Sequence, residues 1–98
     1  MRVKLSPRAR QDLHDLVRHI ARDSPRNARL VRERIAEAIE KLKLHPESGR
    51  PGRVDGTREL VIPHTAHIAA YRISSRTLEI SAFIHESQQW PDHLRGVL

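Results

Sequence analysis

Apolar positions in the first half of the chain recur at the spacing of an α-helix, in two separate stripes. The first stripe comprises Ala9, Leu13, Leu16, Val17, Ile20 and Ala21, and the second comprises Ala28, Val31, Ile35, Ala38, Ile39 and Leu42. Ser6-Pro7 and Ser24-Pro25 precede them, and serine followed by proline is a typical helix start. His45-Pro46 should end the second helix. Because the link between the stripes is short, the pattern predicts an antiparallel helical hairpin.

In the second half the period changes to two, which is typical of β-strands. Strands are expected at Glu59–Ile62, His67–Ile73 and Thr77–His85, joined as two consecutive hairpins, and a short strand at Arg2–Leu5 should pair at the sheet edge. Along the last strand, Leu78, Ile80, Ala82 and Ile84 should point one way, and Glu79, Ser81, Phe83 and His85 the other. We expect the face with Phe83 and His85 to be the one that the helices leave uncovered.

These elements predict an α+β fold. A helical hairpin should cover one face of a small antiparallel sheet of about four strands. With 98 residues the chain has room for a single domain, which we place at residues 1–98.

Residues 45–59 separate the helical half from the strand-like half. This segment holds three of the four glycines and two of the six prolines, so it should form a loop. It also carries Arg50, Arg53 and Arg58. These arginines could bind a phosphate or an acidic protein segment. Alternatively, Arg58 pairs with Glu59 or Glu47 and the other two are solvated.

Composition points to an anionic partner. The chain has 18 Lys and Arg against 12 Asp and Glu, a net charge of +6. It has no cysteine, which excludes disulfides and thiolate zinc sites and suits a cytoplasmic location. No apolar run approaches the length of a membrane span, so no membrane attachment is expected. His64 and His67 alone supply too few ligands for zinc, and we expect neither a metal nor a cofactor.

The order of these segments resembles the RelE/ParE superfamily, the toxins of type II toxin–antitoxin modules. The matching segments are Leu5-Ser6-Pro7-Arg8-Ala9 with Asp12-Leu13, Ile20-Ala21-Arg22-Asp23-Ser24-Pro25, Leu44 to Arg53, Thr57-Arg58-Glu59-Leu60, Tyr71-Arg72-Ile73 and Ile84-His85. The resemblance implies a toxin that is neutralised in a hetero-oligomer by an antitoxin encoded beside it. The antitoxin should contribute an acidic, amphipathic segment.

Members of this superfamily act on different targets. RelE-like members cleave mRNA on the ribosome, whereas ParE-like members inhibit DNA gyrase. Two long helices and the Ser-Pro link resemble the ParE side. RelE-like nucleases carry basic residues on the sheet and a tyrosine near the C-terminus, but here the matching strand position is Ile68 and the tail has no tyrosine. The resemblance therefore favours a gyrase inhibitor of the kind that stabilises plasmids. An mRNA endonuclease and a degenerate toxin kept only as antitoxin partner and co-repressor are the alternatives.

If the chain is a nuclease, its catalytic residues should be His85, Arg58, Arg72 and Tyr71. Histidine can act as acid or base near neutral pH, arginines can stabilise a charged phosphorane, and tyrosine can donate a proton. Alternatively, His85 merely ends a strand, and Tyr71 packs in the core with its hydroxyl bonded at the edge. If the chain is instead a binding protein, Arg50, Arg53, Arg58 and Trp90 are the candidate contacts with target or antitoxin.

Overall fold

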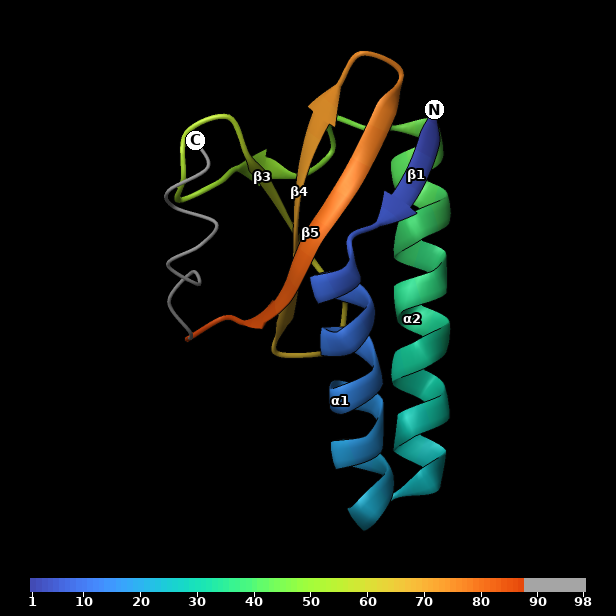
Figure 1. Ribbon diagram of the computed structural model, residues 1–98. Helices are drawn as coiled ribbons and strands as arrows, with labels where there is room; N and C mark the ends of the chain where they lie inside the picture. Colours follow the sequence, from blue (N-terminus) through green and yellow to red (C-terminus); the bar gives the residue numbers. More distant parts are fainter. Residues whose placement is uncertain (88–98) are drawn as a thin grey trace.

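The structure is a computed structural model in which residues 1–87 are described, and they form two helices and five strands (Figure 1). The elements in chain order are β1 (Arg2–Leu5), α1 (Pro7–Asp23), α2 (Pro25–Leu44), β2 (Arg50–Pro51), β3 (Arg58–Val61), β4 (His67–Ser74) and β5 (Thr77–His85). The α+β fold with its helical hairpin is as predicted. The candidate Trp90 lies outside the described residues.

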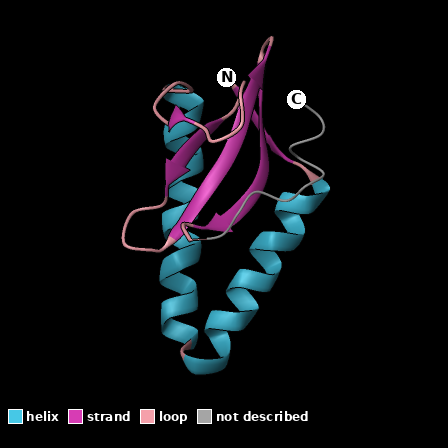
Figure 2. Ribbon diagram, turned by 90° about the vertical axis from the view of Figure 1, so that its left-hand side faces the viewer, coloured by secondary structure: helices cyan, strands magenta, loops and turns pink. Residues whose placement is uncertain are grey.

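Both helices begin at the predicted serines. The Ser6 hydroxyl accepts a hydrogen bond from the Ala9 N–H at 3.0 Å, and the Ser24 hydroxyl accepts one from the Asn27 N–H at 3.1 Å. Ser24 also donates its own N–H to the Ile20 carbonyl oxygen at 2.9 Å, so one residue ends α1 and begins α2. The apex of the hairpin projects beyond the end of the sheet (Figures 1 and 2). In the part of the chain that the structure describes, neither helix combines the length and the apolar character needed to span a membrane.

The sheet has the strand order β1-β5-β4-β3-β2. The strands β3, β4 and β5 pair antiparallel, as predicted, and the unpredicted β2 also pairs antiparallel with β3, but β1 pairs with β5 in parallel. The sheet is therefore mixed rather than purely antiparallel. The short strand β2 brings the number of strands to five, because the Pro-Gly loop runs back along β3 for two residues.

The two helices pack on one face of the sheet, and the main core lies between these layers. Its buried residues include Ala9 from α1, Ile35 and Leu42 from α2, and Tyr71 and Phe83 from the sheet. A smaller buried cluster, formed by Ile68, Ala70, Ala82 and Ile84, lies on the opposite face of β4 and β5. The second predicted stripe packs in the main core from Val31 to Leu42, whereas the first does so only through Ala9, Leu13 and Leu16.

The predicted alternation along β5 is wrong beyond Ile80, because a β-bulge interrupts the strand. Tyr71 lies opposite Ile80, whereas the preceding Ala70 lies opposite Ala82, so Ser81 is the additional residue. Leu78 and Ile80 therefore belong to the main core, but Ala82 and Ile84 belong to the smaller cluster. Phe83 faces the helices and not the uncovered side.

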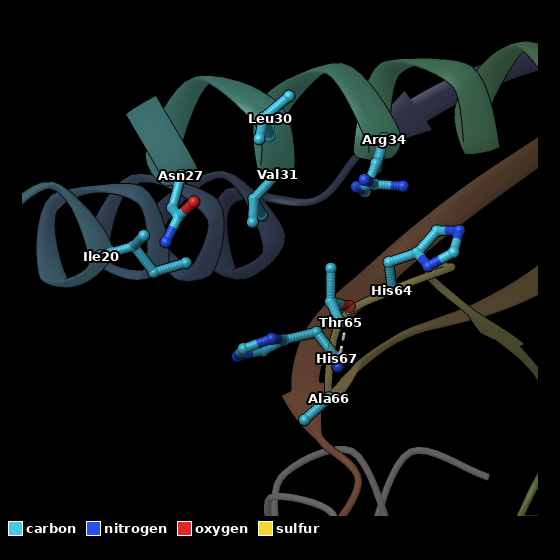
Figure 3. Close-up of a pocket in the computed structure, with 9 residues that line it drawn as sticks. All are labelled: Ile20, Asn27, Leu30, Val31, Arg34, His64, Thr65, Ala66 and His67. Carbon is cyan, nitrogen blue, oxygen red and sulfur yellow. Dashed lines mark hydrogen bonds between the residues drawn. The ribbon is translucent and has the colours of Figure 1, made fainter. Parts of the chain in front are cut away.

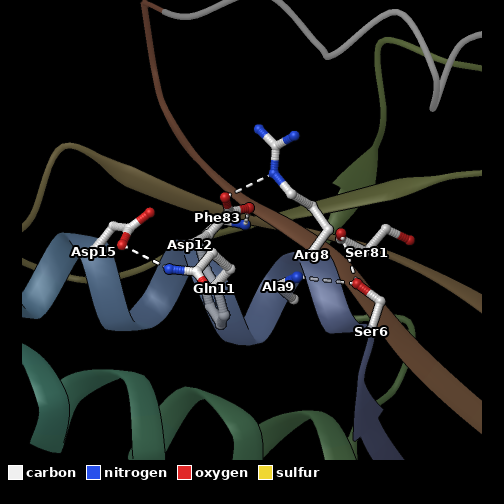
Figure 4. A network of polar contacts seen from close by, with 8 residues as sticks. All are labelled: Ser6, Arg8, Ala9, Gln11, Asp12, Asp15, Ser81 and Phe83. Carbon is white, nitrogen blue, oxygen red and sulfur yellow. Dashed lines mark hydrogen bonds and ion pairs between the residues drawn. The ribbon is translucent and has the colours of Figure 1, made fainter.

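Side chains of α1 satisfy the backbone groups that the bulge leaves unpaired (Figure 4). The Ser6 hydroxyl donates to the Ser81 carbonyl oxygen at 2.9 Å. The Asp12 carboxylate accepts from the Phe83 N–H at 3.1 Å and pairs with Arg8 at 2.7 Å. The bulge is thus held by the first two turns of α1, and its position depends on the helix.

Candidate functional site

Two arginines of the loop converge on the buried carboxylate of Glu59. Only 1% of the Glu59 side chain is exposed. The Arg50 guanidinium lies 3.3 Å from one carboxylate oxygen, and Arg53 lies 3.4 Å from the other through Nε and donates its backbone N–H at 2.9 Å. Arg53 also donates to the Glu86 carbonyl oxygen at 3.1 Å, which joins the loop to the end of β5. A buried carboxylate with such partners fixes the loop, while more than a third of each arginine side chain stays exposed.

The contacts of Arg58 differ from the pairing with the Glu59 or Glu47 side chain that the sequence suggested. It donates to the Gly49 carbonyl oxygen at 2.8 Å and to the Glu47 carbonyl oxygen at 3.3 Å. These partners are backbone oxygens, so Arg58 holds the chain that leaves α2. The arginines that pair with Glu59 are Arg50 and Arg53.

Tyr71 holds the same segment from inside the core. Its side chain is fully buried, and its hydroxyl donates to the Pro46 carbonyl oxygen at 2.7 Å and accepts from the Gly49 N–H at 2.9 Å. Burial raises the pKa of Tyr71 above its ordinary value, and the Gly49 hydrogen bond and the charge of Arg58 lower it only in part. The hydroxyl therefore stays protonated and satisfies two backbone groups of the loop.

His85 is the last residue of β5 and precedes Glu86, whose carbonyl oxygen Arg53 contacts. His85 is paired with His67 across the two strands, with ring centroids 5.5 Å apart in an edge-to-face arrangement. The Nδ1 atom of His85 accepts the Ser87 N–H at 3.2 Å. Burial, followed by the charge of His85, lowers the pKa of His67 below its ordinary value, so His67 is held neutral.

The four residues predicted for a nuclease do not converge on one site. Arg58 and Tyr71 lie opposite each other at the loop, but Arg72 follows Tyr71 on β4 and so points to the other face of the sheet. His85 is four residues farther along the strand pair, about 13 Å away at the usual rise of a strand. The contacts of Arg58 and Tyr71 are those of groups that hold the backbone.

A groove lies between the hairpin and the turn that joins β3 to β4 (Figure 3). We call it the hairpin–turn groove, and its volume is about 360 Å³. The residues that line it are Ile20, Asn27, Leu30, Val31 and Arg34 from the helices, His64, Thr65 and Ala66 from the turn, and His67 from the start of β4. It combines apolar side chains with an arginine and two histidines. An amphipathic acidic segment would suit such a surface.

The sequence reasoning missed this groove and the role of Glu59. One available signal was Leu30, an apolar residue outside the stripe of α2, which is 38% exposed in the structure. Another was Glu59 itself, because it is an acidic residue that comes soon after three arginines in the sequence. The sequence pattern does not show that the loop folds back over β3, and without that contact Glu59 looks like an ordinary surface residue.

Comparisons with known proteins agree on one family. The sequence profile described as "ParE toxin of type II toxin-antitoxin system, parDE" matches residues 3–90. A protein of Sinorhizobium fredii (strain NBRC 101917 / NGR234) named "Putative toxin Y4kP" is 42% identical over 93 residues, which cover 95% of this chain and 96% of that protein. The solved structure "Chromosomal ParDE TA system from P. aeruginosa" shares the fold with a TM-score of 0.77 and 24% identity, covering 87% of this chain and 95% of that one.

The hairpin packed on a sheet is thus a fold that this chain shares with a chain of that ParDE system. The chain belongs to the ParE toxin family of type II toxin–antitoxin systems, which confirms the family resemblance and the fold class expected from the sequence. Membership in this family implies an antitoxin as its partner.

Proposed function

We propose that this toxin arrests growth by inhibiting DNA gyrase through protein contacts, without catalysing a reaction. One observation carries the proposal: the side chains that a nuclease would need are separated and engaged in holding the fold. Tyr71 and Arg58 bind the backbone of residues 46–49, and His85 ends β5 opposite His67, away from the position opposite Tyr71. A general acid or base must reach the reacting atoms together with the phosphate-binding groups, and this geometry does not bring them together.

Gyrase supercoiling and ribosome-dependent mRNA cleavage should be measured side by side with the purified full-length toxin. The expected result is inhibited supercoiling with intact mRNA, and addition of the antitoxin should restore supercoiling. A variant with Arg50→Gln, Arg53→Gln and Glu59→Gln, compared with Glu59→Gln alone, tests whether the exposed loop arginines contact the target, because the buried carboxylate is then not left without its ion-pair partners. We expect its inhibition of gyrase to be weaker than that of Glu59→Gln by about thirtyfold, since two lost charged contacts of about 1 kcal/mol each amount to about 2 kcal/mol.

Intact supercoiling would overturn the proposal, and the other readouts separate its rivals. Ribosome-dependent cuts that disappear in His85→Ala would establish the endonuclease. No effect in either assay, together with normal growth on expression, would indicate a toxin that serves only as the partner of its antitoxin and as a co-repressor.

The antitoxin segment is proposed to occupy the hairpin–turn groove. Support comes from the composition of that surface: Leu30 and Val31 offer apolar contacts, and Arg34 offers a charge for an acidic side chain. A helix or strand with acidic residues on one side and apolar residues on the other would match both features. Arg50 and Arg53 are the second cationic surface available to the same partner.

Leu30→Glu tests this placement, and Leu44→Glu is its matched control. Both leucines are exposed on α2, but Leu44 ends the helix outside the groove. We expect Leu30→Glu to weaken antitoxin binding by roughly tenfold to a hundredfold, because it adds a negative charge against an acidic segment and removes an apolar contact. Leu44→Glu should bind as the unmodified toxin does. Equal losses in both variants, or in neither, would place the antitoxin elsewhere.

A further inference from the structure

The outer side of the helical hairpin carries a line of cationic residues that the proposed function does not use. On α1, Arg10, His14, Arg18 and Arg22 follow each other at intervals of four residues. On α2, Arg29 and Arg32 lie beside this line, and Arg32 lines the same shallow groove between the helices as Arg10 and Arg18. We call these six residues the outer arginine face.

All six side chains are exposed, and within residues 1–87 none of them has a hydrogen bond or ion pair to another residue. Two acidic residues share the surface, Asp15 on α1 and Glu33 on α2. Asp15 accepts a hydrogen bond from Gln11 at 2.8 Å, and the nearby Asp12 is turned toward β5. Five arginines against two carboxylates leave a surface with a net positive charge.

We propose that the outer arginine face binds the phosphate backbone of duplex DNA. Residues four apart on a helix are separated by about 6 Å along its axis, so the line from Arg10 to Arg22 extends over about 18 Å. A regular, rigid row of cations suits a regular row of phosphates, and arginine bonds phosphate with a planar fork of donors. This proposal does not depend on gyrase being the target.

The balance of side chains distinguishes this surface from the hairpin–turn groove, because arginines outnumber apolar residues in its lining, whereas the hairpin–turn groove has a single arginine. The apolar residues beneath the arginines are Leu13 and Val17, which are half-buried, and Leu13 packs against the main core. An amphipathic helix needs a row of apolar pockets to dock. An exposed large apolar side chain, Leu30, lines the hairpin–turn groove, whereas the large apolar side chains of the outer arginine face are half-buried. Binding to phosphates needs cations alone.

The test is fluorescence anisotropy of a labelled 30-base-pair DNA duplex of arbitrary sequence, titrated with the full-length toxin freed of its antitoxin. Binding with a Kd in the micromolar range is expected, because contacts with the backbone alone give that affinity. The variant Arg18→Gln with Arg32→Gln should lower the slope of log K against log salt by about 1.8 and weaken binding on the order of 10- to 100-fold at 0.1 M salt. Arg10→Gln with Arg22→Gln should have a similar effect at independent positions.

The matched control is Arg2→Gln with Arg76→Gln, which removes the same charge from exposed positions away from the outer arginine face. It should keep the slope and the affinity of the unmodified toxin. The proposal is overturned if the control loses as much as the two test variants, or if the unmodified toxin does not bind the duplex. It is also overturned if an acidic peptide of matched charge binds the toxin as tightly as the duplex does, and if the two test variants lose that binding. The face would then accept a protein segment. Circular dichroism should show all three double variants folded, because each changed side chain is exposed and unbonded.

Discussion

The Tyr71 hydroxyl accepts a hydrogen bond from the Gly49 N–H at 2.9 Å, and these two residues are 22 positions apart in the chain. The bond joins the centre of the sheet to the turn that follows α2. It requires the backbone at residue 49 to approach the ring closely, which a residue without a side chain permits. The cationic loop that follows is therefore anchored at its beginning by the core and farther along by Glu59.

Tyr71→Phe should destabilise the protein by about 2 kcal/mol. The substitution keeps the ring but leaves the Gly49 N–H and the Pro46 carbonyl oxygen without their partner, and unsatisfied buried groups are costly. Urea denaturation measures the change. Ser74→Ala, which removes an exposed hydroxyl at the end of β4, serves as the control and should stay within about 0.5 kcal/mol. If Tyr71→Phe is as stable as this control, the hydroxyl does not hold the loop.

Gly49→Ala should cost about 1 to 3 kcal/mol of unfolding free energy, because the added methyl group overfills a closed space. A Cβ atom at this position would lie 2.6 Å from the Tyr71 hydroxyl oxygen, 2.8 Å from a ring carbon and 3.0 Å from the Glu59 carbonyl oxygen. The change is measured by thermal or urea unfolding. The control is Ser48→Ala at the exposed neighbouring position, which should leave the unfolding free energy unchanged. A neutral Gly49→Ala would show that the loop can move away from the ring at little cost.

Ser6→Ala should destabilise the protein by about 1 to 2 kcal/mol, since one hydroxyl both caps α1 and bonds the bulge. Ser24→Ala removes the cap of α2 but no contact with the sheet, so it should cost less. The difference between the two variants in urea denaturation estimates the value of the Ser6–Ser81 contact. Equal losses would mean that this contact adds no stability beyond the cap.

Stability should fall as the pH is lowered from about 7 toward 5, in part through His67. Its pKa in the folded chain lies below the ordinary value of 6.5, so the unfolded chain binds more protons in this window. The loss of unfolding free energy caused by His67 is absent above pH 6.5, and it grows as the pH falls toward the pKa of His67 in the folded chain. His67→Gln should flatten the dependence of the urea midpoint on pH, whereas the exposed His14→Gln should leave it unchanged. The same slope in both variants would exclude His67 as the cause.

Local patterns in the sequence predict much of this fold. Ser6-Pro7, Ser24-Pro25 and His45-Pro46 mark helix boundaries through contacts within a few residues, and the period-two segment marks the strands. The bulge at Ser81 was not predictable in this way. Its unpaired backbone groups are satisfied by Ser6 and Asp12, which are more than 65 residues away in the chain.

The candidate site was less accessible to sequence reasoning than the fold. The arginines of the loop stand out by composition, but their shared partner Glu59 becomes evident only when β2 folds back on β3. For Tyr71 the sequence left two roles open, a proton donor or a core residue with a bonded hydroxyl, and its burial and two backbone hydrogen bonds match the second. The family resemblance indicated the class of protein, whereas the positions of these side chains decide which chemistry the class member can perform.

The single-residue junction at Ser24 has a consequence for assembly. Small proteins exchange elements between copies when a hinge straightens and two adjacent helices become one. Here the hinge would have to become helical at Ser24, and a residue before proline disfavours that backbone conformation. Straightening would also abolish the cap that begins α2. The junction therefore opposes the exchange of a helix between two copies of the chain.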